Sequence, residues 1–407
     1  MAKSSYPHIL IVGAGLSGLT LAQILRKNGI SYEVFERDVD VNARTQGWAI
    51  ALHGPVLRDL KECLPEDIGP IEQTNHLIPL DLQAQFVFYD KNRPGLRVGV
   101  NDNETGQIVR ANRQRLRDYL RRFIPVQYDK RVVRVEEADG KVTVFFEKGG
   151  SATGDVVVGA EGTQSAVRKH ILHNKDVMKG LPTGSLVGEV ELTGDDFKQQ
   201  LELGHSAYIV LTRAENHAVI FAALNKVSPD GKKGYYYFLL HWFDEQAAHS
   251  APDNPYWTLT ATKEELAVFA REHTKLLPER LRSLVDKVPV EGYKTPGITL
   301  RSVELTPEQL PPGRVTLMGD AAHSMTPFRG EAGVCALQDA VNLGRTLTHI
   351  ANAQLKGPDF LAVMTKYRDD MLTRGAEAAE RSGSISKTQN ITCGKVGVPL
   401  PEETINI

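Results

Sequence analysis

A glycine-rich turn near the start of the chain constrains its fold more than any other feature. The segment Gly13 to Gly18 has the spacing G-x-G-x-x-G, follows a short β-rich run at residues 8–12 and opens a helical pattern over residues 16–28. In such a turn the first glycine permits a tight bend, the second lets the backbone approach a pyrophosphate, and the third lets the helix pack against the strand. Glu36 ends the next predicted strand, near the usual spacing of about 20 residues, where its carboxylate can accept hydrogen bonds from a ribose. The sequence therefore predicts a dinucleotide-binding βαβ unit, in which FAD and NAD fit equally well.

Two later segments share one pattern, a buried strand that ends in small residues and an acid. The first runs from Gly154 to Arg168 and carries Glu161. The second runs from Arg314 to His323 and carries Asp320, and a helix is predicted after it over residues 333–350. Ligands of open α/β folds bind at the carboxyl ends of the strands, so Asp320 can accept from a polyol hydroxyl and the amides that begin the helix can face a negative charge. The alternative for Asp320 is an ordinary turn residue, and the alternative for Glu161 is an ordinary surface acid.

The middle of the chain has a different pattern. Four β-like runs at residues 184–193, 206–213, 217–224 and 234–243 predict an antiparallel sheet, and residues 262–285 are predicted to be helical. Because this sheet lies between the second and third nucleotide-binding segments, we expect a discontinuous cofactor domain with an inserted substrate domain. The expected boundaries are 1–75, 100–180 and 290–360 for the cofactor domain, 76–99 and 181–289 for the substrate domain, and 361–407 for a C-terminal helix and tail.

The last of the four β-like runs, Gly234 to Phe243, is unusually aromatic. Alternation places Tyr237 and His241 on one face of the strand and Tyr236 and Trp242 on the other. Either face can line a pocket for an aromatic substrate, although packing within the sheet is the commoner role for any one of these residues. On the first face, Tyr237 or His241 can orient or deprotonate a phenol, and these two are the candidate catalytic side chains.

Composition narrows the function further. The 407 residues carry a formal net charge of −2, and the densest basic stretch, residues 110–122, is interpreted as a solvated helix face, which argues against nucleic-acid binding. The three cysteines are far apart, so no disulfide framework or metal-ligand spacing follows from them, and a reducing, cytoplasmic setting fits best. No apolar stretch approaches the length of a membrane span. We expect a monomer or homodimer that acts on a small organic molecule.

Taken together, in order and spacing, the three segments resemble the class A flavoprotein monooxygenases, which have the para-hydroxybenzoate hydroxylase fold. The late segment is similar to the GD motif of that family, with G-D-A-A-H from Gly319 followed by Pro327 and by Asp339-Ala340 on the helix, and the middle segment is similar to its DG motif. The resemblance extends from residue 8 to about residue 350. It implies an α/β protein with a discontinuous Rossmann-like FAD-binding domain of glutathione-reductase type and an inserted, mostly antiparallel β-sheet substrate domain.

The resemblance also implies a set of FAD contacts. The glycine turn would hold the pyrophosphate, Glu36 the adenosine ribose and Asp320 the ribityl chain, while Pro327 would pack beside the isoalloxazine. Arg44 and Arg113 would contact the phosphate and ribityl region, and the backbone amides of residues 330–334 would face the flavin pyrimidine edge. The implied cofactor-binding residues are Gly13, Gly15, Leu16, Ser17, Gly18, Glu36, Arg37, Arg44, Ala49, Arg113, Gly319, Asp320, Pro327, Gly330, Ala332, Gly333 and Val334.

Two positions depart from the family pattern. Glu161 stands where the DG motif usually has aspartate. The run Gly330-Glu331-Ala332-Gly333-Val334 replaces the G-x-G-Asn of the family, so that Ala332 adds a methyl group and an asparagine side chain is missing. Gly333 then offers a replacement flexible point one position later.

The activity implied by the resemblance is oxygen insertion. The enzyme would place one atom of O2 on a small aromatic or electron-rich substrate through a flavin C4a-hydroperoxide, after reduction by transiently bound NADH or NADPH. The cofactor carries this chemistry, so no protein nucleophile or metal is required. The alternatives are a flavin oxidase or Baeyer–Villiger oxygenase on the same fold, a non-catalytic escort protein, and an NAD-dependent dehydrogenase that the first glycine turn alone supports. A flavin halogenase is disfavoured because the sequence has no W-x-W-x-I-P segment.

Overall fold

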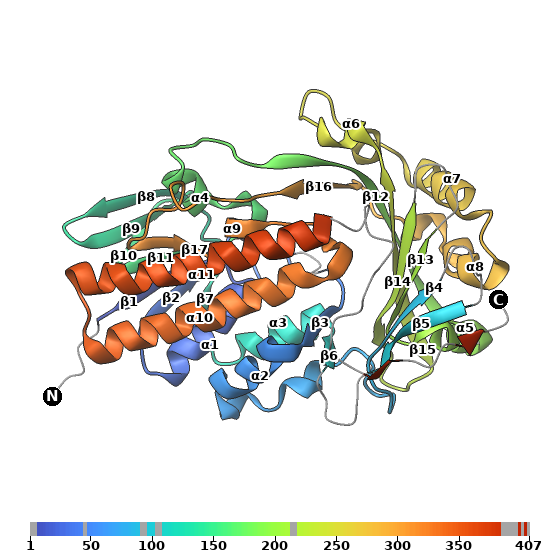
Figure 1. Ribbon diagram of the computed structural model, residues 1–407, viewed down its shortest axis with the longest axis horizontal. Helices are drawn as coiled ribbons and strands as arrows, with labels where there is room; N and C mark the ends of the chain where they lie inside the picture. Colours follow the sequence, from blue (N-terminus) through green and yellow to red (C-terminus); the bar gives the residue numbers. More distant parts are fainter. Residues whose placement is uncertain are drawn as a thin grey trace.

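The computed structural model describes residues 6–43, 47–89, 96–101, 108–211, 218–383, 398–399 and 403–404. These residues form two lobes, which are seen side by side in Figure 1. The first lobe holds a parallel sheet and the long helices near the C-terminus, and the second holds a large curved sheet with shorter helices on its outer side. The architecture is the predicted α/β fold with a second, mostly antiparallel sheet.

The parallel sheet of the first lobe has five strands in the order β17-β11-β1-β2-β7. Its strands are β1 (His8–Val12), β2 (Ser31–Phe35), β7 (Val126–Gln127), β11 (Val156–Gly159) and β17 (Val315–Leu317). The run of valines in β11 is buried throughout, as expected of a parallel sheet covered on both faces. The three segments predicted to bind a nucleotide thus supply neighbouring strands, and their carboxyl ends meet at one edge of the sheet.

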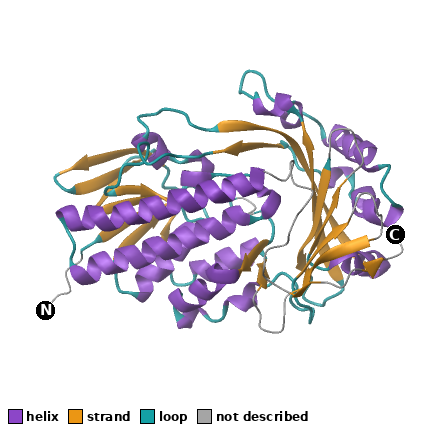
Figure 2. Cartoon of the chain, in the orientation of Figure 1, coloured by secondary structure: helices purple, strands orange, loops and turns teal. Residues whose placement is uncertain are grey.

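Helices cover this sheet, and two long ones run side by side across the lobe in Figure 2. These are α10 (Glu331–Ala353) and α11 (Gly357–Gly383). The remaining helices of the lobe are α1 (Leu16–Lys27), α2 (Gly54–Cys63), α3 (Arg113–Arg121), α4 (Ala166–Ile171) and α9 (Asp320–His323), with the 3₁₀ turns η1 (Glu66–Ile68), η2 (Ile71–Thr74), η3 (Gly162–Gln164) and η6 (Pro327–Arg329). Two small antiparallel sheets complete it, β8 (Val132–Ala138), β9 (Lys141–Phe146) and β10 (Ser151–Gly154) in one, and β3 (Ile50–His53) with β6 (Ile108–Ala111) in the other.

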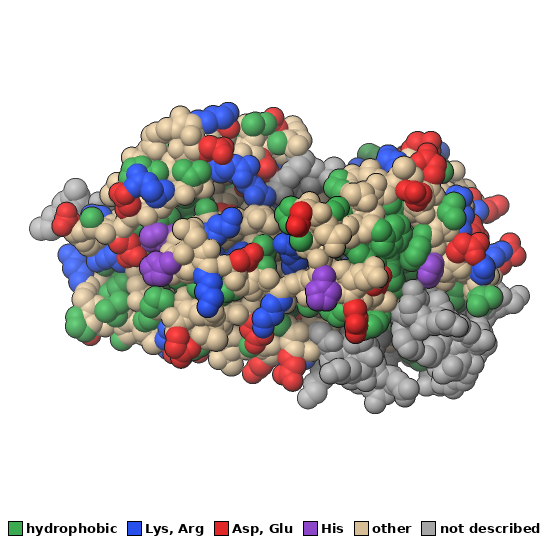
Figure 3. All heavy atoms as spheres, turned by 90° about the horizontal axis from the view of Figure 1, so that it is seen from above, with side chains coloured by type: hydrophobic (Ala, Val, Ile, Leu, Met, Phe, Trp, Pro, Cys, Tyr) green, Lys and Arg blue, Asp and Glu red, His purple; other side chains and the backbone are tan. Residues whose placement is uncertain are grey.

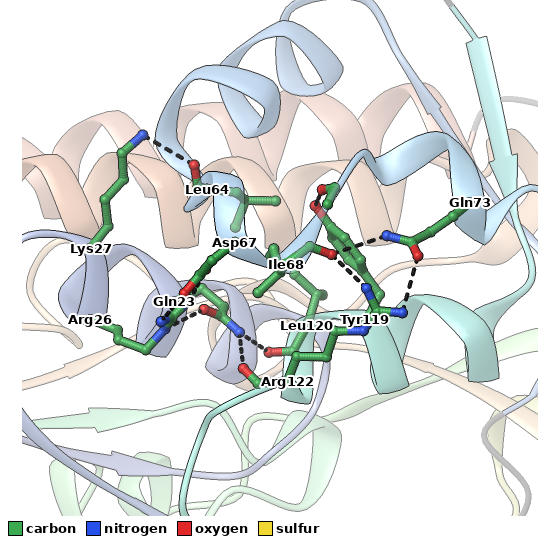
Figure 4. A network of polar contacts seen from close by, with 11 residues as sticks. Gln23, Arg26, Lys27, Leu64, Asp67, Ile68, Gln73, Tyr119, Leu120 and Arg122 are labelled. Atoms are coloured by element: carbon green, nitrogen blue, oxygen red, sulfur yellow. Dashed lines mark hydrogen bonds and ion pairs between the residues drawn. The ribbon is translucent and has the colours of Figure 1, made fainter.

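A polar network ties α1 to α3 and to the turn η1 (Figure 4). The buried Gln23 side chain of α1 donates to the carbonyl oxygens of Leu120 and Arg122 at 2.8 and 2.7 Å, and these belong to the last turn of α3. Gln23 also accepts from Arg26, which forms a paired contact with Asp67. The otherwise unsatisfied carbonyls at the end of α3 are therefore capped by a side chain from a neighbouring helix.

The large sheet of the second lobe has the strand order β16-β12-β15-β14-β13-β4-β5-β18, and β19 also pairs with β5. Its strands are β4 (Gln85–Tyr89), β5 (Leu96–Asn101), β12 (Lys179–Thr193), β13 (Ala207–Leu211), β14 (Val219–Val227), β15 (Lys233–Phe243), β16 (Ile298–Ser302), β18 (Val398–Pro399) and β19 (Glu403–Thr404). All pairs are antiparallel except β13 with β4. β16, which follows the predicted insertion in sequence, extends the same sheet.

The outer side of the large sheet packs on helices. Tyr236, Phe238, Leu240 and Trp242 of β15 are buried in one hydrophobic cluster with apolar residues of α5 (Gly194–Gly204), α7 (Lys263–Thr274) and α8 (Glu279–Lys287). The single helix predicted over residues 262–285 is wrong in this respect, because Pro278 separates α7 from α8. Proline disfavours helical backbone in the residue before it, so α7 ends and α8 begins with Pro278 as its N-cap.

Two features of the described residues bear on membrane and nucleic-acid binding: the hydropathy of the helices and the distribution of surface charge. None of the helices in the described part of the chain combines the length and apolarity that crossing a bilayer requires. Figure 3 shows acidic and basic side chains interspersed over both lobes.

Candidate active site

The three glycines of the N-terminal turn meet three different steric situations. Gly13 has a φ of 108°, and a Cβ there would lie 2.5 Å from the Ala160 carbonyl oxygen just after β11. A Cβ on Gly18 would overlap the Gly13 carbonyl oxygen, so this glycine lets α1 pack onto the turn. Gly15 has an ordinary φ of −77°, and among the described residues its Cβ would meet nothing nearer than that Ala160 oxygen at 4.0 Å. Packing within the protein thus explains the first and third glycines and leaves space in front of the second.

The start of α1 keeps its amides available on that side. No side chain caps the helix and its first turn, which includes Leu16 and Ser17, holds no acidic residue. The positive end of a helix dipole therefore meets the space in front of Gly15 without a compensating negative charge in the first turn.

Glu36 lies buried where β2 ends and contacts the glycine turn directly. Its Oε2 accepts from the backbone N–H of Ala14 at 2.9 Å, and its Oε1 accepts from that of Asp38 at 3.1 Å. Arg37 follows it, half-buried. The predicted acidic partner of the turn is thus placed beside it, with its orientation set by two backbone amides.

The basic stretch at residues 110–122 is not the solvated face that the sequence predicted. Arg110 and Arg117 are buried, with 7% and 2% of their surface exposed. Arg117 donates to the carbonyl oxygens of Ala14 and Val41 at 3.3 and 3.0 Å, so it holds the glycine turn from the side of α3. The sequence pattern hid this role because Arg117 turns inward from α3 and Arg110 lies on β6, before the helix begins.

Asp320 follows the carboxyl end of β17 and is the first residue of α9. It is half-buried, and no hydrogen bond reaches its carboxylate from any residue that the structure describes. Gly319 before it has a φ of 60°, and a Cβ there would lie 2.9 Å from that of Ala336 in α10 and 3.5 Å from Ser17 Oγ in α1. The tight packing of Gly319 therefore places the neighbouring Asp320 near the N-terminal turns of both α1 and α10.

The buried carboxylate of Asp339 on α10 anchors this turn. Its Oδ2 accepts from the Gly319 N–H at 2.8 Å and lies 2.5 Å from His323 Nε2, and its Oδ1 accepts from Arg374 of α11 at 2.6 Å. Burial alone would raise the pKa of Asp339, but His323 and Arg374 hold that pKa below its usual value. Asp339 therefore stays ionised and positions the turn that presents Asp320.

The N-terminus of α10 is also open. Gly330 caps it in the left-handed conformation with φ 66°, no side chain caps its amides, and Pro327 before it is exposed. The flexible point expected at Gly333 is wrong, because this residue lies within the helix and a Cβ there would overlap the Ile50 side chain of β3. Gly333 is small to admit Ile50, while Ala332 and Val334 are half-buried in apolar contacts.

Only one of the two arginines predicted to contact FAD lies among the described residues. Arg44 lies outside the described residues. Arg113 begins α3 and lies beside Gly47, where a Cβ would be 3.8 Å from its Nη1. Ala49, half-buried, comes directly before β3. Arg113 thus lies beside Gly47, two residues before Ala49, and its contact with FAD stays a prediction.

Glu161 is engaged within the protein. Its carboxylate accepts from Ser165 Oγ at 2.6 Å and from the backbone N–H groups of Ala166 and Val167 at 3.0 and 3.2 Å. It therefore caps the start of α4, and burial raises the pKa of its carboxyl. Glu161 is therefore not an ordinary surface acid, and its carboxylate is already engaged by groups of the protein.

The side of the large sheet that faces the first lobe is aromatic, and we call it the inner face: Phe86, Phe221, Tyr237, Leu239 and His241. Trp48, just before β3, stacks on Tyr237 with ring centroids 5.2 Å apart and an interplanar angle of 21°. Trp48 Nε1 also donates to Glu189 of β12 at 2.7 Å, and Lys294 pairs with the second oxygen of Glu189. Sequence reasoning missed Trp48, because this contact joins segments far apart in the chain.

Arg110 of β6 reaches the same place. Its Nη2 donates to the Tyr237 hydroxyl at 3.1 Å, and its guanidinium lies over the Phe221 ring, 5.6 Å from the centroid. Burial raises the pKa of Tyr237 and Arg110 opposes this change. The candidate Tyr237 is therefore a buried neutral phenol that touches a buried cation.

His241 lies at the other end of the inner face. Its ring meets that of Phe328 in η6 edge to face, with centroids 4.9 Å apart. Burial lowers the pKa of His241 to about 4, and its Nδ1 has no hydrogen-bond partner among the described residues. The two candidates Tyr237 and His241 are separated by about 13 Å along the strand at roughly 3.3 Å per residue. Leu239 lies between them.

Comparison with known proteins places the whole arrangement in one group. The family model described as an FAD binding domain matches residues 7–381. Among curated proteins, the chain is 42% identical over 381 residues to the FAD-dependent monooxygenase thnD of Trichoderma harzianum, covering 92% of both chains.

Solved structures share the fold at lower identity. The HpxO protein of Klebsiella pneumoniae in complex with FAD and uric acid has a TM-score of 0.71 and 21% identity, over 95% of this chain and 90% of that one. The 2,6-dihydroxypyridine-3-hydroxylase of Arthrobacter nicotinovorans has a TM-score of 0.73 and 16% identity, over 100% of both chains.

Proposed function

Because this chain belongs to the family of FAD-dependent monooxygenases, we propose that it inserts one oxygen atom of O2 into a small aromatic or electron-rich substrate at the expense of NADH or NADPH. Family membership sets aside the NAD-dependent dehydrogenase and the non-catalytic escort protein. The proposal includes a cytoplasmic monomer or homodimer, and the free thiols of Cys63 and Cys335 agree with a reducing setting.

One observation carries the proposal: three segments that are distant in sequence meet at one edge of the parallel sheet, and some of their polar groups have no hydrogen-bond partner among the described residues. Within the described part of the chain, the space before Gly15 is open, no side chain caps α1 or α10, and the Asp320 carboxylate has no hydrogen bond. A bound FAD would satisfy all of these groups. In this proposal the glycine turn binds the pyrophosphate, Glu36 the adenosine ribose, Asp320 the ribityl chain and the start of α10 the pyrimidine edge. When bound, FAD supplies hydride acceptance and oxygen activation.

The residues of the chain then position the substrate and exclude water. Leu239 and the neighbouring aromatic rings form an apolar surface, which favours a flat substrate and a dry site. His241 is neutral above about pH 4, so its unpaired Nδ1 can accept a hydrogen bond from a substrate hydroxyl. Tyr237 donates or accepts at the other end of the same face.

The test begins with the absorption spectrum of the purified protein and its titration with FAD. The holoenzyme is next mixed anaerobically with NADH and with NADPH, in the presence of candidate phenols, indoles and enols. We expect a bound flavin that bleaches with one of the two, and weaker FAD binding in the Asp320→Asn variant. No bleaching with either reductant would contradict the proposal.

The product distinguishes the outcomes that this scaffold allows. Hydroxylation, epoxidation and Baeyer–Villiger oxygenation each add one oxygen atom to the product mass, and the position of that oxygen separates them. An oxidase would instead remove two hydrogens and release H2O2 in equal amount.

A further inference from the structure

We infer that Arg110 binds an anionic oxygen of the substrate, so that the substrate is a flat conjugated acid: a carboxylate, phenolate or enolate attached to an unsaturated ring. This inference rests on the proposed function, because it takes the inner face as the place where substrate binds. The chain supplies a buried cation on β6 and flat aromatic side chains from other elements beside it.

The unmet demand is the charge of Arg110 itself. Its side chain is 7% exposed, and no carboxylate lies within ion-pair distance of it among the residues that the structure describes. Among the described residues, its buried Nε has no hydrogen-bond partner, and its Nη2 donates to the neutral Tyr237 hydroxyl. A buried cation without an anion costs free energy, and native proteins normally pair it.

Two other buried arginines show how this chain satisfies a guanidinium when the role is structural. Arg117 donates to two backbone carbonyl oxygens, those of Ala14 and Val41. Arg168 likewise donates to the carbonyl oxygens of Ala321 and Thr163. Arg110 has no such pair of carbonyls in the described part of the chain, so its environment is incomplete in a way that theirs is not.

Among the described residues, the polar neighbours of Arg110 do not neutralise its charge. His76, whose backbone N–H donates to the Arg110 carbonyl oxygen, has a pKa well below its usual value because of burial and of Arg110 itself, so it is neutral. The nearby Glu189 is held by Trp48 and Lys294. An anion that binds here therefore meets a cation that pairs with no carboxylate in the described part of the chain.

The walls around Arg110 select flat molecules. Trp48 stacks on Tyr237, and the ring centroid of Phe221 lies 6.0 Å from that of Tyr237 and 5.6 Å from the guanidinium carbon of Arg110. Aromatic faces favour offset stacking with another ring. A conjugated acid satisfies both the stacking surface and the cation, whereas a flat neutral amide or a flexible aliphatic acid satisfies one of them.

The experiment compares an acid with its neutral amide on the FAD-loaded protein. Binding of 2-naphthoate and 2-naphthamide is measured by isothermal titration calorimetry, without NAD(P)H, for the unaltered protein and for Arg110→Met, Arg110→Lys and Tyr237→Phe. A charge-assisted hydrogen bond corresponds to an affinity difference of about 10- to 100-fold. We expect the unaltered protein to prefer the acid by that factor.

The variants decide whether Arg110 is the source of the preference. Arg110→Met should bind both probes equally, Arg110→Lys should keep part of the preference, and Tyr237→Phe should keep it, because the guanidinium remains. An unaltered protein without preference, or an Arg110→Met variant that retains it, overturns the inference. If Arg110→Met does not fold, the loss of preference is sought in Arg110→Gln. Flavin content and bleaching by NAD(P)H, recorded on the same samples, report separately on the proposed function.

Discussion

At the scale of single residues, the glycines of the N-terminal turn separate cofactor binding from folding. The Gly15→Ala side chain would enter the open space before α1, so we expect loss of FAD binding with little change in the melting temperature of the apoprotein. The Gly18→Ala side chain would overlap the Gly13 carbonyl oxygen, so the apoprotein should lose about 1–3 kcal/mol of stability. Flavin titration and apoprotein melting of both variants check this. Equal destabilisation would show that the space before Gly15 belongs to the fold.

His241 should make the stability of the protein depend on pH. The unfolded chain protonates this residue below about pH 6.5, whereas the folded protein keeps it neutral down to about pH 4. The stabilisation is therefore present above pH 6.5 and is lost as the pH falls toward 4, by at most about 3 kcal/mol. Urea unfolding at pH 7 and pH 4.5 should show a smaller loss for His241→Leu than for the unaltered protein. Parallel losses would contradict this assignment.

The residues of the site divide according to how far apart in sequence their partners lie. The glycine turn, Glu36 and Asp320 are predictable because a strand, a tight turn and an acid follow one another within a short segment. Trp48 and Arg110 are not, because their importance arises only when β3 and β6 meet β15. Arg110 and Arg117 were misjudged because the spacing of arginines along the chain does not tell which of them are buried. Arg110 moreover lies on β6 and not on the predicted helix.

At the scale of elements, Gln23 joins α1 to the C-terminal end of α3. The Gln23→Ala change would leave the carbonyl oxygens of Leu120 and Arg122 without their donor, at a cost of about 1–3 kcal/mol. Asp67→Ala, which removes the exposed partner of Arg26 in the same network, should change the melting temperature much less. Thermal unfolding of both variants measures the difference, and similar effects would place the importance of the network at its exposed end.

Strands and helices were predictable where their local pattern is unambiguous. β12, β14 and β15 match the predicted runs closely, because alternation and turn residues mark them. β4 joins the sheet parallel to β13, a pairing between distant segments that no local pattern records. Pro278 divides a helix whose apolar periodicity alone predicts continuity, since the pattern is blind to the conformational restriction that proline imposes.

At the scale of the whole molecule, the contact of Gly333 with Ile50 couples the open end of α10 to the strand pair that reaches the inner face. The Gly333→Ala side chain would overlap Cδ1 at the end of the Ile50 side chain, so Ile50 must shift, and we expect a small loss of stability together with a loss of FAD affinity. The Ile50→Ala change alone leaves a cavity, and the double variant should recover a large part of both losses because each substitution relieves the other. Unfolding and flavin titration of the three variants form a double-mutant cycle. Additive losses would show that α10 and β3 do not act on one another.

The bond between Arg374 and Asp339 has a consequence for how the protein is made. Asp339 holds the turn that presents Asp320, and Arg374 lies in α11, close to the end of the described helical chain. The glycine turn leaves the ribosome before α11 does, so Asp339, on the opposite side of the site, can pair with Arg374 only after residue 374 has been synthesised. A ribosome that stalls before α11 would therefore leave a nascent chain without a finished flavin site, however well its first strands had formed.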